Sequence, residues 1–200
     1  MGTNHDPKTV LLTGVSVGQA IEDHCQELLF SRDDARPNVL CVSLINGPEQ
    51  YLAGWDPAQF DQVHDLVMLA PDASVRSAAG ADADSDAPST NYEHVVLDAP
   101  GNIPLLGSRI TDILYRWEKN SNPIQVCFDS LTVLTQFTSK DAVSRFVHVL
   151  RGHLLKVNAH SHFHIDPHAH DDQEFTQFLS QFDDVVDAQG DSTRLSGSDR

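Results

Sequence analysis

A run of histidines between residues 160 and 170 is the densest group of side chains able to do chemistry. Imidazole or carboxylate side chains recur there at every second position: His160, His162, His164, Asp166, His168 and His170. Because alternate side chains of a β-strand point to one face, His160, His162 and His164 would share a face if this segment is a strand. Histidine and aspartate are common zinc ligands, so all six residues are candidate metal ligands.

Three interpretations of this run remain open. The imidazoles could be hydrogen-bonded within a polar sheet face, could hold a transition metal, or could act with neighbouring carboxylates as a pH-sensitive switch. The run departs by one residue from the HxHxDH pattern of metallo-β-lactamase-fold hydrolases. That fold needs further ligands downstream, where only a helix and a polar tail are expected. A metal-dependent hydrolase that uses the segment from His160 to His170 is therefore an alternative function.

Asp129 is the second candidate for chemistry. It ends an apolar segment, residues 124–128, that follows Pro123. Such a segment is typical of a strand buried on both faces in a parallel sheet. Ligands of open α/β sheets bind outside the carboxyl ends of the strands, so Asp129 and the adjacent Ser130 are expected at a ligand edge.

A glycine-containing turn, from Gly14 to Gly18, separates an expected strand at residues 9–13 from an expected helix at residues 18–30. Strand, glycine turn and helix are the context of a phosphate-binding P-loop. This turn has three residues between its glycines instead of four, and Gln19 and Ala20 stand where a P-loop has Lys and Ser or Thr. It is either a plain connection or a degenerate nucleotide site, whose candidate residues are Gly14, Gly18, Gln19, Asp129 and Ser130.

The elements that must position these residues alternate between strands and helices. This pattern predicts an α/β fold with a mainly parallel sheet covered by helices on both faces. Expected strands are 9–13, 39–44, 65–69, 94–97, 124–128, 159–165 and 184–188. Expected helices are 18–30, a short piece at 49–53, one with Leu106, Ile110, Ile113 and Trp117 on a single face, one that begins at the capping-box pair Thr138 and Asp141, and 172–182.

The expected domain organisation is simple. Residues 1–188 are predicted to form one domain, interrupted by a flexible acidic loop at 73–91, and residues 189–200 are predicted to be a disordered tail.

Composition narrows the partners and the setting. The net charge is −16, from 29 acidic and 13 basic residues. Nucleic-acid binding draws its affinity from clustered Lys and Arg, so DNA and RNA are not expected partners. The acidic excess is typical of proteins from high-salt cytoplasm. Three cysteines without CxxC spacing are interpreted as small buried hydrophobes in a reducing compartment, and neither an export signal nor a membrane span is expected.

Two segments carry a resemblance to a known family. Residues 41–50, CVSLINGPEQ, resemble the second-strand segment of KaiC-like and Rad55-like ATPases of the RecA superfamily, and residues 126–132, VCFDSLT, resemble their Walker B strand. In segment order, residues 9–188 resemble the haloarchaeal RecA-superfamily proteins labelled HTR-like.

The resemblance implies a RecA-like core that holds ATP or ADP with magnesium at the carboxyl edge of the sheet. This sequence departs from the family pattern in its degenerate Walker A turn, and Ile45 and Asn46 replace the catalytic Glu. Only Asp129 remains of the three functional elements. The expected function is therefore that of a pseudo-ATPase: a non-catalytic regulatory or scaffold protein in signalling or motility that binds a protein partner. A nucleotide-binding switch without efficient hydrolysis is an alternative, and the resemblance is also compatible with a homo-oligomer.

Overall fold

The computed structural model describes residues 8–15, 19–30, 36–72 and 91–189. The predicted loop at 73–91 and the predicted tail at 189–200 therefore lie almost entirely outside the described residues. The elements follow one another as β1 (Thr9–Thr13), α1 (Gln19–Phe30), β2 (Asn38–Ser43), α2 (Pro48–Leu52), α3 (Pro57–Asp61), β3 (Asp65–Ala70), β4 (Asn91–Val96), α4 (Ile103–Trp117), β5 (Ile124–Asp129), α5 (Leu131–Phe137), α6 (Lys140–Lys156), β6 (His160–Ile165), the 3₁₀ helix η2 (Pro167–Ala169), α7 (Asp172–Leu179) and β7 (Asp184–Asp187).

The described strands form one seven-stranded sheet in the order β4-β3-β2-β5-β6-β1-β7. Every pairing in it is parallel. The prediction of an α/β fold with a parallel sheet is confirmed. β5, the apolar segment that ends at Asp129, lies at the centre, where both faces must be covered.

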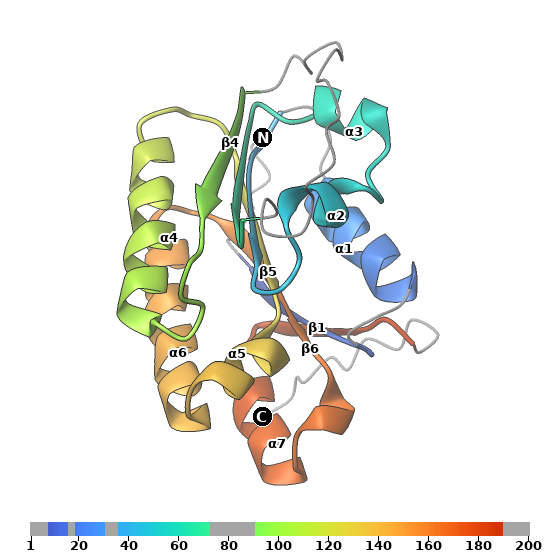
Figure 1. Ribbon diagram of the computed structural model, residues 1–200, viewed down its shortest axis with the longest axis vertical. Coiled ribbons are helices and arrows are strands. Elements are labelled where there is room, and N and C mark those ends of the chain that lie inside the picture. The colour runs from blue at the N-terminus through green and yellow to red at the C-terminus, as the bar shows by residue number, and fades with distance from the viewer. Residues whose placement is uncertain (1–7, 16–18, 31–35, 73–90, 190–200) are drawn as a thin grey trace, which may run out of the picture.

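Helices cover both faces of the sheet, as predicted (Figure 1). On one face, α4, α6 and α7 pack over a core that includes Phe128 and Phe163. The opposite face is covered by α1, α2 and the residues around α3, which pack on a smaller core with Leu12, Cys41 and Cys127. The predicted apolar stripes of α4 and α6 are buried against the first face: Leu106, Ile110, Ile113 and Trp117, and Val143, Phe146, Val147, Leu150 and Leu154.

Several local predictions were wrong. The helix expected to start from a capping box at Thr138 begins instead at Lys140, and its N-cap is Ser139, whose side chain accepts a hydrogen bond from the Ala142 N–H. α5 and α3 were not predicted, because each is too short to show a helical period of its own. β4 starts at residue 91 rather than 94, since it is a largely exposed edge strand without apolar alternation.

None of the helices in the described part of the chain combines the length and the apolar surface that crossing a bilayer requires.

Candidate functional site

The carboxyl edge of the sheet brings together the two ends of the predicted nucleotide site. Gly14 follows β1, Asp129 ends β5, and β6 lies between these two strands. The Gly14 N–H donates to the carbonyl of Ile165 at the end of β6 (3.1 Å). A Cβ on Gly14 would approach the Ala188 side chain to 3.2 Å, so close packing explains this glycine without a ligand. Gly18 lies outside the described residues, and Gln19 is the first residue of α1.

Ser130 and Asp129 have structural partners at this edge. The Ser130 Oγ accepts a hydrogen bond from the Val133 N–H and caps α5. The carboxylate of Asp129 lies 3.3 Å from the Nδ1 of His164 on β6. Asp129 therefore contacts an imidazole of the histidine run, a contact that the sequence did not indicate.

The first part of the histidine run, His160–Ile165, forms β6, and its alternation is as predicted. Phe163 and Ile165 point into the core beneath α4, α6 and α7. His162 and His164 point to the opposite face, where their rings stack at a centroid distance of 5.3 Å. Both imidazoles are buried, with 3% and 6% of the residue exposed.

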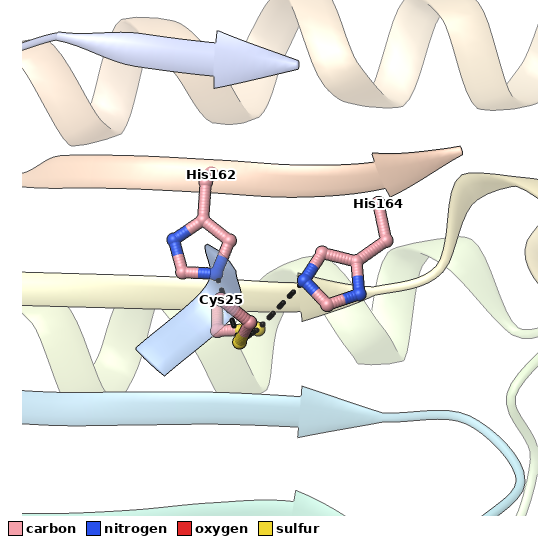
Figure 2. A group of neighbouring side chains, drawn as sticks. Cys25, His162 and His164 are labelled. Atoms are coloured by element: carbon pink, nitrogen blue, oxygen red, sulfur yellow. Dashed lines mark hydrogen bonds between the residues drawn. The ribbon is translucent and has the colours of Figure 1, made fainter. Parts of the chain in front are cut away.

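Two cysteines meet these imidazoles in a buried cluster, here called the Cys/His cluster: Cys25, Cys127, His162 and His164. One potential ligand atom from each residue lies within 4.8 Å of all the others. The Sγ atoms of Cys25 and Cys127 are 3.4 Å apart. The Nε2 of His162 is 3.2 Å from the Cys25 Sγ, and the Nε2 of His164 is 3.5 Å from the Cys127 Sγ. Figure 2 shows both imidazoles reaching from β6 towards Cys25 on α1.

Strand register and helix packing assemble the cluster. Cys127 on β5 pairs directly with His162 on β6, so the two side chains emerge side by side on the same face. α1 crosses that face and buries Ile21, Cys25 and Leu29, which are spaced one helical turn apart, against it. The Cys25 side chain therefore packs against β5 and β6 from the side that α1 covers.

Two further side chains touch the cluster from its rim. The hydroxyl of Tyr51 on α2 is 2.9 Å from the Cys127 Sγ. Asp129 contacts the imidazole nitrogen of His164 that faces away from the sulfurs. Cys41, the third buried cysteine, is the partner of Cys127 on the neighbouring strand β2, but it is not part of the group of four.

The cluster shifts the protonation of its members. A hydrogen bond from Cys127, together with the positive potential of His162 and His164, lowers the pKa of Cys25 well below its usual value despite burial. Burial alone would lower the pKa of His164, but Cys25 and Asp129 outweigh it and raise that pKa from 6.5 to about 10. Burial raises the pKa of Cys127. These shifts favour a thiolate at Cys25 and an imidazolium at His164.

The other four predicted metal ligands do not join this cluster. The Nδ1 of His160 accepts a hydrogen bond from the backbone N–H of Lys8. Asp166 caps η2 by accepting from the His168 N–H, and His168 is exposed. His170 contacts the hydroxyl of Thr132 through its Nε2 (3.0 Å). Within the described part of the chain, they belong to no other group of three or more potential ligands.

Sequence reasoning therefore found half of the cluster. It singled out His162 and His164 but interpreted Cys25 and Cys127 as inert core residues. The only signal for the cysteines is their burial pattern, which is shared by every apolar residue on the same face. Their convergence depends on which strands are neighbours and on which helix covers them.

A separate surface feature lies between α4 and α6. It is a groove of about 490 Å³. Its apolar part includes Ile103, Gly107, Phe146 and Val149, and Arg145 and His153 add positive or titratable groups. Among the described residues that line the groove there is no Asp or Glu, although the net charge of the chain is −16.

Comparisons with known proteins identify the fold and a family. A family model described as "Family of unknown function (DUF7504)" matches residues 7–188. None of the curated proteins matches the sequence. Among solved structures, an uncharacterized protein from Pyrococcus horikoshii, PH0321, crystallised in complex with an unknown peptide, is similar with a TM-score of 0.55 and 12% identity over 90% of this chain and 76% of that one. Another, PH0250 from Pyrococcus horikoshii OT3, has a TM-score of 0.56 and 8% identity over 94% of this chain and 84% of that one.

Proposed function

The chain belongs to the DUF7504 family of unknown function, and we propose that it is a non-catalytic regulatory or scaffold protein with a RecA-like fold, which acts by binding other proteins. Residues 41–50 and 126–132, which resemble segments of RecA-superfamily ATPases, support descent from a nucleotide-binding protein. Signalling or motility is the setting that this resemblance suggests.

The contact between Asp129 and His164 carries the non-catalytic part of the proposal. By its resemblance to the Walker B strand, the segment 126–132 gives Asp129 the place of the acidic residue that would position magnesium. Here its carboxylate faces an imidazole at 3.3 Å instead. Ser130 is likewise used to cap α5. Gln19 and Ala20 also replace the Lys and the Ser or Thr of a P-loop. These two positions therefore supply neither a positive charge for the triphosphate nor a hydroxyl ligand for its magnesium ion.

Calorimetric titration of magnesium ATP and magnesium ADP into the reduced protein, in molar potassium chloride, tests this part. We expect no binding up to about 1 mM nucleotide, which corresponds to a binding free energy weaker than about 4 kcal/mol. A Glu49→Gln variant, which removes a carboxylate of α2 within the same second-strand segment, serves as a control. ATP turnover by wild type that is lost in Asp129→Asn would refute the proposal, and binding without turnover would favour the nucleotide switch.

The groove between α4 and α6 supports the protein-binding part. Val149 is 59% exposed, and Arg145 stands beside it on the same helix. Apolar walls with a cation at the rim suit an extended or helical segment that carries apolar anchors and an acidic residue. The Pyrococcus horikoshii protein with the unknown peptide supports a peptide-binding role for this fold.

Substitution of Val149 tests the groove. Leu155, which is 45% exposed on the same helix but does not line the groove, provides a matched control. We expect Val149→Asp to weaken binding of an identified partner at least about tenfold, because a buried carboxylate would lose its hydration, whereas Leu155→Asp should leave the affinity unchanged. Equal effects of the two substitutions would place the interface elsewhere.

We infer a reducing, salt-rich cytoplasm as the setting. The three cysteines are free thiols in the structure, and the net charge of −16 would be screened in high salt.

A further inference from the structure

We propose that Cys25, Cys127, His162 and His164 form a site for one zinc ion, which joins helix α1 to the central strands β5 and β6. The site is independent of the proposed protein-binding function.

The spacing of the four side chains fits a tetrahedral ion. With Zn–S bonds of about 2.3 Å and Zn–N bonds of about 2.0 Å, two sulfurs in a tetrahedral site lie about 3.8 Å apart, and a sulfur and a nitrogen about 3.5 Å apart. The corresponding distances here are 3.4 Å between the sulfurs, and 3.2 and 3.5 Å for the two sulfur–nitrogen contacts. All pairs of ligand atoms lie within 4.8 Å, so side-chain shifts of up to about 1 Å would close the group around the ion.

The donor set selects the metal. Two thiolates and two imidazoles are a common ligand set of structural zinc sites, whereas magnesium and calcium require oxygen ligands. Binding displaces the thiol protons and any imidazolium proton to solvent. The two thiolate charges then cancel the charge of the ion, so that the site adds no net charge to a buried region. This matters because the four residues are at most 6% exposed.

The rim residues hold the ligands in the required orientation. Asp129 can accept the Nδ1–H of His164, which leaves the Nε2 with its lone pair directed at the sulfurs. A carboxylate behind a ligating histidine fixes the tautomer and raises the basicity of the ligand. Tyr51 can donate its hydroxyl hydrogen to the Cys127 sulfur, which stabilises the thiolate.

A complete set of four protein ligands indicates a structural ion rather than a catalytic one. A catalytic zinc keeps a coordination position for water, and the buried Cys/His cluster leaves none. The ion would connect three elements that are far apart in sequence, since Cys25 and Cys127 are separated by 102 residues and Cys25 and His162 by 137. Its removal should loosen α1 in particular, because Cys25 is the only ligand that does not come from the sheet.

Metal analysis of the reduced, untagged protein tests the site. After dialysis against zinc, wild type should retain about one equivalent per chain, and Cys25→Ser and Cys127→Ser should retain less than about a tenth. Cys41→Ser is the matched control, because Cys41 is equally buried on the same sheet face but outside the cluster. His168→Ala controls for binding by exposed imidazoles.

Cobalt(II) titration of wild type gives a second readout that does not depend on the folding of any variant. One equivalent should produce the visible bands of tetrahedral cobalt and a sulfur-to-cobalt charge-transfer band. Wild type that retains no zinc and shows no such band overturns the proposal. So does metal loss in Cys41→Ser equal to that in Cys25→Ser, or a wild-type cobalt spectrum without sulfur ligation, which would indicate adventitious binding to surface histidines.

Discussion

Replacement of Asp129 separates its two candidate roles, as a magnesium-positioning acid and as the partner of a zinc-ligating histidine. Its carboxylate lies 3.3 Å from the Nδ1 of His164, and its side chain is 27% exposed. Loss of such an outer partner typically weakens metal binding by about 10- to 100-fold, or about 1.4–2.7 kcal/mol.

The two available substitutions should differ within that range. Asp129→Asn keeps an oxygen that can accept the His164 Nδ1–H but loses the negative charge, so the zinc dissociation constant should rise about tenfold. Asp129→Ala removes the acceptor as well and leaves an imidazole that is 6% exposed without this partner, so the increase should approach about 100-fold.

Competition for zinc with a chelator of known affinity measures these changes in reduced protein. Asp166→Asn is the control, because Asp166 lies at the same sheet edge but caps η2 rather than contacting His164. The reasoning is refuted if Asp129→Ala binds zinc within about twofold of wild type, or if Asp166→Asn weakens it equally.

Three further outcomes are expected. Burial raises the pKa of Asp183, but hydrogen bonds from Thr9 and the charge of Arg151 outweigh burial and lower that pKa. The ionised carboxylate therefore stabilises the fold fully above pH about 4, the pKa of an unfolded Asp, and this stabilisation is lost as the pH falls through the lower pKa of folded Asp183. The difference in urea midpoint between wild type and Asp183→Asn should narrow over that range. Phe128→Ala, which leaves a cavity beside Phe163, should lower the free energy of unfolding by about 3–5 kcal/mol in urea titrations, whereas a loss below about 1 kcal/mol would contradict the observed packing. Ser130→Ala should cost about 1 kcal/mol through loss of the α5 cap, with zinc content unchanged, and loss of zinc would mean that Ser130 supports the site directly.

Much of the fold could be predicted because burial leaves a periodic pattern in the sequence. The stripe from Leu106 to Trp117 marks α4, and the apolar segment before Asp129 marks the central strand. The predictions were less accurate where that pattern is weak. The start of the exposed edge strand β4 was misplaced, and the seven-residue helix α5 was not predicted, since neither presents a complete buried face.

For the candidate site too, the sequence predicted only the features that follow from local periodicity. Alternation in β6 by itself determined that His162 and His164 share one face and that Phe163 lies on the other. It also allowed His160 to share their role, but in the structure His160 pairs with the backbone of Lys8.

Only the tertiary structure decided which residues the two imidazoles meet. Cys127 is their neighbour because β5 lies beside β6 in a register that pairs Cys127 with His162, and Cys25 joins them because α1 covers that face. A period of two fixes the face of a side chain but not the order of strands in a sheet or the helix above it. Those are set by packing between segments that are distant in sequence: Cys127 and His164 are 37 residues apart, and Cys25 and Cys127 are 102 residues apart. At such separations the local sequence of one segment does not identify its partner.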